Sequence, residues 1–192
     1  MAEAAQLADP DEAVASVPAD FARIVRQHQG MVFSLALHFL RDRQAAEEVA
    51  QDVFLQLHAN LATLQSPDHV TFWLRKVTGH RCIDYTRRRK WAPVSLEQVP
   101  ELREAGSRSD PLLARRLKQL VGSLPENARM VVILRYQEDL TPSEIAEVLA
   151  MPVATVKSHL QRSLALLREK LARTLRPKAA AGSLGAWKEE TA

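Results

Sequence analysis

Cysteine is almost absent from the sequence, because the 192 residues contain Cys82 alone. A single cysteine excludes an intrachain disulfide and a cysteine-rich metal site, and this agrees with a reducing compartment. No apolar run approaches the roughly 18 residues that a membrane-spanning helix requires, and the chain does not open with the charged and apolar regions of a secretory leader. We therefore expect a cytoplasmic protein without membrane insertion.

The motifs of common enzyme classes are also missing. The sequence has no glycine-rich phosphate loop, no carboxylate pair in a cleft-like context and no nucleophile motif. His80 and Cys82 are two residues apart on a predicted helix, so they point to different sides and do not suit a metal site. We expect no catalytic residue, no metal, no cofactor and no small-molecule substrate.

Glycine is scarce as well, with six in the whole chain, and runs of β-branched residues are few. A hydrophobic content of 46% with 26% charged residues is typical of a folded protein rather than a disordered one. The low glycine content favours helices. The net charge of +3 is modest, but a pI near 9.2 permits an anionic partner.

One stretch has the composition of a linker, since three prolines and a Gly-Ser pair lie between Trp91 and Pro111. The predicted fold class is all-α, with two small helical domains joined by this flexible linker and a helix-turn-helix in the second. The predicted segments are a disordered N-terminus (1–17), a first helical block (18–90), the linker (91–111), a second helical block (112–175) and a flexible C-terminal tail (176–192).

The helix-turn-helix is predicted from turn chemistry. Thr141 suits the N-cap of a helix, Pro142 suits its first position, and Glu144 completes a capping box three residues after the cap. The residue before Pro152 is disfavoured in a helix, so we expect the break near Met151. An ordinary helical hairpin with a solvated polar face is the alternative interpretation.

The helix after this break carries polar and cationic side chains that could reach phosphates and base edges in a major groove. The residues that we assign to this DNA-facing side are Thr155, Lys157, Ser158, His159, Gln161 and Arg162.

A second cationic helix is predicted in the first block. From Arg75 to Lys90 there are seven Lys or Arg residues against the single acid Asp84, with Trp73 and Tyr85 among the interleaved aromatics. Such a helix suits phosphate contacts combined with stacking on exposed bases. The aromatic residues could instead be ordinary core, but a solvated face usually mixes charges of both signs.

The predicted helix from Ala45 to Leu61 has a different polar face. It carries Glu47, Glu48, Gln51, Asp52 and Gln56, a strip better suited to a protein partner than to DNA. Simple solvation of the strip is the alternative.

Taken together, these segments resemble a bacterial sigma factor of the extracytoplasmic-function type. Ala46–Phe54 (AEEVAQDVF) is similar to the polymerase-binding helix of that family, and Phe72–Arg88 to its promoter-melting helix that reads the −10 element. Leu124–Tyr136 resembles the helix pair before the helix-turn-helix. Thr155–Ser158 (TVKS) matches the start of the helix that reads the −35 element. The order and spacing of these motifs carry the resemblance, which covers most of the chain.

The resemblance implies three partners: core RNA polymerase, promoter DNA and an anti-sigma factor. It implies that the first block is sigma region 2 and the second block sigma region 4. The implied polymerase contacts are Glu47, Glu48, Gln51 and Asp52. The implied −10 contacts are Leu64, Gln65, Ser66, Trp73, Lys76, His80, Arg81, Asp84, Arg87 and Arg88. The implied −35 contacts are the six residues assigned above from Thr155 to Arg162.

Some positions depart from the family pattern. The family usually has Asn at the position of His80 and a basic residue at that of His159, and an arginine often stands where this chain has Leu164. These departures affect promoter preference rather than family. A helix-turn-helix repressor or activator outside the polymerase, and a sigma mimic that binds regulators, are the alternative functions. The cationic helix argues against the mimic, and no ligand-sensing or dimerisation domain supports the repressor.

We predict that Lys157→Ala combined with Arg162→Ala weakens −35-dependent initiation, because a good bidentate contact to a base contributes ~1–3 kcal/mol of discrimination. Binding to core polymerase should be unchanged in the double variant. Transcription from one promoter and co-purification with core polymerase measure the two effects, and loss of polymerase binding would show that this surface is misassigned.

Overall fold

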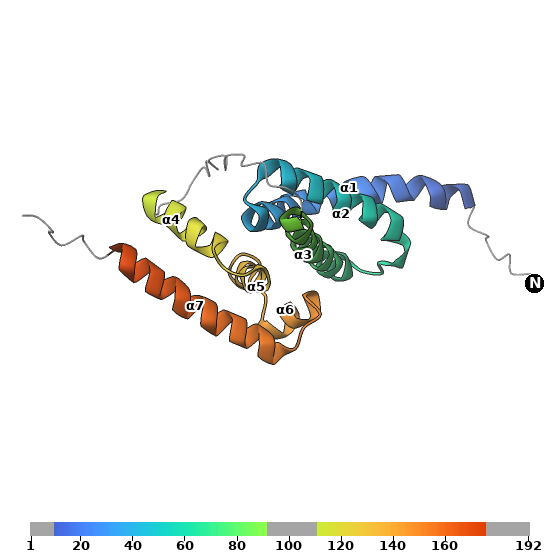
Figure 1. Cartoon of the computed structure of the whole chain (residues 1–192). Coiled ribbons are helices and arrows are strands. Elements are labelled where there is room, and N and C mark those ends of the chain that lie inside the picture. The colour runs from blue at the N-terminus through green and yellow to red at the C-terminus, as the bar shows by residue number, and fades with distance from the viewer. Residues whose placement is uncertain (1–9, 92–110, 176–192) are drawn as a thin grey trace, which may run out of the picture.

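The computed structural model describes residues 10–91 and 111–175, and within them it is entirely helical (Figure 1). The predicted all-α class is therefore confirmed. Residues 1–9, 92–110 and 176–192, which include the predicted tail and nearly all of the predicted linker, lie outside the described residues. The elements are α1 (Pro10–Leu40), α2 (Arg43–Asn60), a 3₁₀ turn η1 (Leu61–Thr63), α3 (Pro67–Trp91), α4 (Pro111–Gly122), α5 (Glu126–Tyr136), α6 (Pro142–Val148) and α7 (Val153–Leu175).

One boundary differs from the sequence prediction. The helix α1 begins at Pro10, inside the segment 1–17 that was predicted to be disordered. A proline is well tolerated as the first residue of a helix, because its missing N–H has no partner there. The helix then continues through Gly30 without a break.

The first block is formed by α1, α2 and α3, each of which packs against the other two. The turn between α1 and α2 is set by Arg41, whose φ is 60°, and by Asp42. The Asp42 carboxylate accepts a hydrogen bond from the backbone N–H of Ala45 at 3.1 Å, so it caps α2. Fully buried apolar side chains fill the centre of this block, with Leu35, Phe39, Val53, Leu57 and Leu74 among the largest.

The second block contains α4 to α7 and the predicted helix-turn-helix. Both bonds of the capping box are present: Thr141 N–H donates to Glu144 Oε2 at 2.7 Å, and Glu144 N–H donates to Thr141 Oγ1 at 3.3 Å. The chain leaves α6 through Ala150, whose φ is 50°, and α7 starts at Val153. The predicted cap and the predicted break near Met151 are confirmed.

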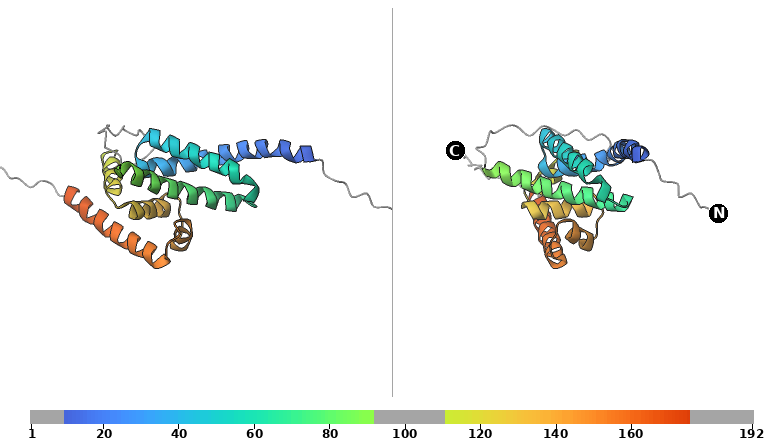
Figure 2. Two further views of the ribbon diagram at one scale, coloured as in Figure 1. Left: turned by 45° about the vertical axis from the view of Figure 1, so that its right-hand side comes forward. Right: turned by 90° about the vertical axis from the view of Figure 1, so that its right-hand side faces the viewer.

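The two blocks lie against each other, which the sequence did not predict. The helix α5 contacts α1 and α3, and α6 contacts α3; Figures 1 and 2 show both helices directly beside α3 in every view. Buried residues of both blocks join in one apolar cluster, which runs from Val32 and Leu35 to Met130, Ile145 and Leu149. A smaller cluster between α4, α5 and α7 is built around Leu124 and Val132.

The described residues lack both a membrane-spanning helix and a cluster of metal ligands. None of the helices there has the length and apolar character to cross a membrane. No group of three or more His, Cys, Asp or Glu side chains in the same residues could hold a metal ion.

Candidate nucleic-acid interface

A shallow groove of about 310 Å³ lies beside α3 and is closed on its other side by α2. Five of the ten predicted −10 residues line it, because their spacing puts them on one face of α3. The residues around the groove are Gln56, Trp73, Lys76, Val77, His80, Arg81 and Asp84. The arrangement combines an aromatic ring with cationic side chains, which is what stacking on a base and contact with its phosphates require.

Two contacts hold the groove residues in place. The side-chain oxygen of Gln56 accepts a hydrogen bond from Arg81 Nε at 2.8 Å when its amide is turned to face the guanidinium. His80 Nε2 lies 3.2 Å from the backbone oxygen of Val148 in α6 and donates to it in the tautomer protonated at Nε2. Sequence reasoning missed Gln56 as a groove residue. The sequence signal that could have found Gln56 is its place on the polar face of α2.

The predicted loop residues Leu64, Gln65 and Ser66 lie just before α3. Ser66 Oγ accepts a hydrogen bond from the backbone N–H of His69 at 3.1 Å and so caps the helix. Gln65 and Ser66 are exposed, whereas Leu64 is half-buried and packs against the core. The groove begins about two helical turns further on, roughly 10 Å along the axis, so these residues extend the surface rather than line the groove.

The C-terminal end of α3 is strongly cationic, and two of its exposed arginines form ion pairs with acidic residues of the same chain. Arg87 and Arg88 are both exposed, and Arg87 Nε lies 3.9 Å from Glu126 Oε2. Arg89 Nη1 donates to Asp42 Oδ2 at 3.0 Å. The hydrogen bond from the Ala45 N–H, and then the Arg89 guanidinium, hold the pKa of Asp42 below its ordinary value. This pair joins the end of α3 to the start of α2.

The predicted −35 side chains gather on the outer face of α7. The opposite face packs inward through Val156, Ser163 and Leu167, which are buried. His159 is half-buried, and so is Leu164, which stands where the family often has an arginine. The exposed members of the predicted set are Thr155, Lys157, Ser158, Gln161 and Arg162.

The residues of the polar strip on α2 point in two directions, some toward the groove beside α1 and one toward α3. Glu47 and Gln51 line a wide groove of about 880 Å³ between α1 and α2. Glu48 instead faces α3: burial first, and then the charge of Glu48, raise the pKa of Tyr85. Asp52 is exposed and does not line the groove.

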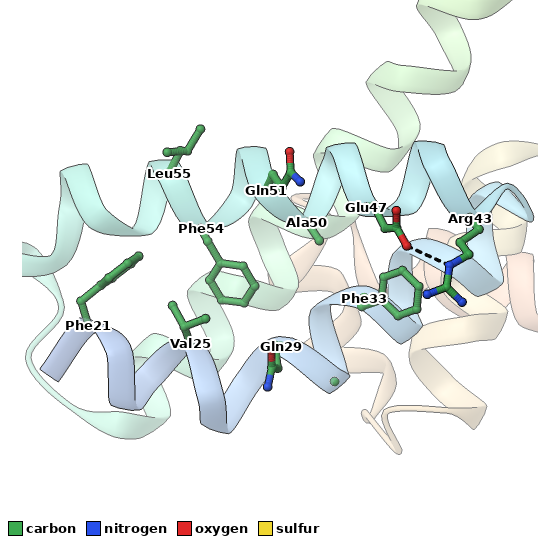
Figure 3. Close-up of a pocket in the computed structure, with 11 residues that line it drawn as sticks. Phe21, Val25, Gln29, Phe33, Arg43, Glu47, Ala50, Gln51, Phe54 and Leu55 are labelled. Carbon is green, nitrogen blue, oxygen red and sulfur yellow. Dashed lines mark hydrogen bonds and ion pairs between the residues drawn. The ribbon is translucent and has the colours of Figure 1, made fainter. Parts of the chain in front are cut away.

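The wide groove is mainly apolar, which the sequence did not predict (Figure 3). Phe21 and Val25 of α1 face Phe54 of α2 across it, while Leu55 stands at its rim and is 70% exposed. At the other end the Arg43 guanidinium lies 5.7 Å from the centre of the Phe33 ring, and its Nε donates to Glu47 Oε1 at 2.8 Å. The run Phe54-Leu55 was the available signal, because two adjacent helical residues point in directions about 100° apart, so one of them is free to face outward.

A helical protein that presents a cationic aromatic groove on one helix and an exposed polar face on a helix-turn-helix belongs to the class of DNA-binding transcription proteins. Residues 24–92 match the family described as sigma-70 region 2, and residues 114–167 match sigma-70 region 4. Together these matches cover well over half of the chain.

Known relatives agree with these matches. The probable RNA polymerase sigma factor RfaY of Xanthomonas campestris is 29% identical over 160 residues, which cover 79% of this chain but only 40% of that protein. The ECF RNA polymerase sigma factor SigW of Bacillus subtilis is 26% identical over 165 residues, covering 79% of this chain and 88% of SigW. The fold is that of the sigma factor RpoE from Bartonella quintana, solved with the anti-sigma factor NepR, with a TM-score of 0.68 at 18% identity over 80% of this chain and 97% of that one.

The chain belongs to the sigma-70 family of RNA polymerase sigma factors, in its extracytoplasmic-function group. Sigma factors bind core RNA polymerase and direct initiation at specific promoters, so they are initiation factors rather than catalysts. The predicted family is confirmed, and it replaces the alternative of a repressor or activator outside the polymerase.

The Asp42–Arg89 pair generates a pH prediction. Because the folded-state pKa of Asp42 is lowered, its charge stabilises the fold above the unfolded pKa of about 4, and this contribution is lost as the pH falls through the folded pKa. Asp42→Asn keeps a residue that can cap α2 but removes the charge. We expect wild type to exceed the variant in free energy of unfolding at pH 7, by less than about 1 kcal/mol for so exposed a pair, and the difference to vanish in acid.

Urea unfolding between pH 7 and pH 3 measures this difference, with Asp84→Asn on α3 as the control. If the difference in free energy of unfolding between wild type and Asp42→Asn stays constant from pH 7 to pH 3, the lowered pKa of Asp42 is not its cause.

Proposed function

We propose that the first block of this sigma factor docks on core polymerase through the groove between α1 and α2. We also propose that α3 holds the opened −10 strand, and that α7 reads the −35 element as duplex. The observation that carries the proposal is the groove on α3, where Trp73 is surrounded by Lys76, His80, Arg81 and Asp84. A helix face that is merely solvated usually mixes charges of both signs, and it does not usually place an aromatic ring beside cationic side chains at one groove.

Stacking on this surface offsets part of the cost of promoter melting. Taking a base out of the stack costs a few kcal/mol, and stacking on an aromatic side chain returns ~1–3 kcal/mol per base. Trp73 supplies that ring, and Lys76 and Arg81 supply charge for the adjoining phosphates. Leu64, Gln65 and Ser66 extend the surface on one side for a displaced base. Arg87 and Arg88 extend it on the other side along the strand.

The outer face of α7 suits the major groove of duplex DNA. Lys157 and Arg162 provide the charged contacts, and a good bidentate contact to a base discriminates by ~1–3 kcal/mol. The remaining members of this face contribute polar contacts: Thr155, Ser158, His159 and Gln161. Since His159 is half-buried, its contribution is made through part of its ring only.

The polymerase surface combines an apolar centre with a polar edge. Phe21, Phe54 and Leu55 offer apolar area to a helical partner, and Glu47 and Gln51 offer polar contacts at the same groove. Protein interfaces commonly have this anatomy, with a buried apolar centre that carries most of the binding energy. Glu48 and Asp52, outside the groove, serve at its edge in this proposal.

Two further elements of function follow from the family. The Bartonella sigma factor was solved with an anti-sigma factor, and we infer that this chain also has an anti-sigma partner. Because the polymerase acts in the cytoplasm, we infer that this chain acts there too.

We predict that the purified chain binds core polymerase and starts transcription at one class of promoter, and that Leu55→Glu lowers its affinity for the polymerase about ten-fold, or about 1.4 kcal/mol. The substitution places a charge at the rim of the apolar groove. Because Leu55 is 70% exposed, the fold should not depend on it. Titration of core polymerase with labelled chain, together with transcription-start mapping, measures both effects.

Gln44→Ala is the matched control, since Gln44 is exposed on the same helix and does not line the groove. It should bind the polymerase like wild type. A wild-type chain that fails to bind core polymerase with no inhibitor present would overturn the proposed function, and equal binding by Leu55→Glu would remove the groove from it.

A further inference from the structure

One arginine of the cationic helix α3 is held by an uncharged side chain of α2. With the Gln56 amide turned toward the guanidinium, Arg81 donates to its oxygen through both Nε, at 2.8 Å, and Nη2. Both side chains are half-buried, and both line the groove beside Trp73. Because a guanidinium is a rigid plane, two donors that share one acceptor fix the direction of the whole group.

The partner of Arg81 differs in charge from the partners of its neighbours on α3. Three other arginines of this helix lie against carboxylates: Arg75 against Glu138, Arg87 against Glu126, and Arg89 against Asp42. A carboxylate offsets the charge of its arginine, so less of that charge is available to an outside phosphate. Gln56 is neutral. It therefore orients Arg81 and leaves the positive charge of the guanidinium undiminished.

The orientation of Arg81 before binding favours affinity for a ligand. A free arginine side chain samples many rotamers, and it loses that freedom when it binds. Since Gln56 already restricts Arg81 in the folded protein, less freedom remains to be lost when a strand binds. The contact occupies the edge of the guanidinium formed by Nε and Nη2, so the N–H groups of Nη1 remain for phosphate oxygens.

We propose that Gln56 is a positioning residue for the −10 strand: it is an uncharged clamp that points Arg81 at a phosphate of the strand whose base stacks on Trp73. The proposal rests on the proposed function, in which α3 holds this strand. Arg81 makes the contact with DNA, and Gln56 acts only through Arg81. A residue of α2 thus determines how well α3 binds the strand, although it does not touch DNA itself.

Two other roles for Gln56 predict different results. If Gln56 only joined α2 to α3, its replacement would lower the stability of the fold and would change DNA binding no more than a matched change elsewhere on α2. If Gln56 contacted DNA directly, its replacement would weaken binding even in a chain without Arg81. The salt dependence of binding and a background that lacks Arg81 separate these roles from the proposed one.

The exchange of the Arg81 Nε proton with water reports the contact in the full chain, independently of the polymerase. In the isotope-labelled chain its N–H resonance is identified by its absence from Arg81→Lys. Gln56→Met keeps the length of the side chain but removes the acceptor, so the exchange rate should rise about five-fold, as expected for the loss of one hydrogen bond. Ala59→Met, at an exposed position of the same helix, should leave the rate unchanged. Equal rates in wild type and Gln56→Met would overturn the proposal.

Binding of the strand is measured with holoenzyme assembled from core polymerase and the full chain. The probe is a fluorescent DNA fork, with upstream duplex and a single-stranded extension that carries the non-template −10 sequence from the mapped transcription starts. Each phosphate contact to a single strand contributes about 0.7 to the slope of log affinity against log salt concentration. The slope therefore reports the number of charged contacts, and the affinity at one salt concentration reports how well they are made.

Two substitutions of Gln56 separate charge from orientation. Gln56→Glu turns the contact into an ion pair, so we expect the slope to fall by about 0.7 and the affinity to fall about ten-fold at low salt. Gln56→Met should leave the slope unchanged and weaken binding about three-fold, because Arg81 keeps its charge but loses its orientation. Ala59→Glu adds the same charge at an exposed position of the same helix and should leave the slope unchanged. A fall in slope with Ala59→Glu as large as with Gln56→Glu would overturn the proposal.

Arg81→Gln supplies the background that separates an action through Arg81 from a direct one. In this background Gln56→Met should not change the affinity further, and Gln56→Glu should not change the slope. A loss of affinity with Gln56→Met that persists without Arg81 would overturn the proposal. Circular dichroism and thermal unfolding confirm that each variant keeps its fold. A wild-type holoenzyme that does not bind the fork would count against the proposed function, while the exchange rate of the Arg81 proton would still decide whether Gln56 holds the guanidinium.

Discussion

The structure depends on covering α5 on all sides. Five consecutive residues of this helix, from Met130 to Leu134, are buried, so its middle turn has no face for water. A helical segment that is apolar all round is stable only inside a core. On one side Val132 packs with Leu124 and the inward face of α7. The other side requires further helices, and α1 and α3 of the first block supply them.

This requirement explains why two blocks with separate tasks form one core. If they part, the side of α5 that faces the first block must meet water or a new partner, at about 25 cal/mol for each Å² of apolar surface. The open form is therefore disfavoured in the isolated chain, and binding energy from another protein has to offset it. Separation of the blocks would expose one apolar side of α5, and that side would then be available to bind another protein.

The sequence predicted those parts of the structure whose signals are local. Thr141, Pro142 and Glu144 set the start of α6 within four residues of one another, and both bonds of their capping box are formed. Trp73, Lys76 and His80 were assigned to one helix through the family resemblance, and they lie together at the groove beside α3. The family motifs then supplied roles for those positions, and these roles stay proposals at the level of single residues.

The parts that the sequence did not predict depend on contacts between distant residues. The bonds from Arg75 to Glu138 and from Gln137 to Ser34 join residues 63 and 103 positions apart, and no periodicity reports such a pairing. The groove between α1 and α2 was missed for a related reason. The apolar pattern of each helix showed that it is buried on one side, but it could not show that Phe21, Phe54 and Leu55 leave a hollow between them.

Arg129 shows how the molecule can open without losing its second block. One guanidinium nitrogen donates to the backbone oxygen of Phe39, and the other donates to Gly122 and Leu124 at 2.6 and 3.2 Å. A cation at the last carbonyls of a helix is favourable, and Arg129 serves α1 and α4 in this way. If the blocks part, the bond to Phe39 is lost and the bonds to Gly122 and Leu124 can remain. The contacts that orient α4 against α5 are thus separate from the bond that joins α5 to α1.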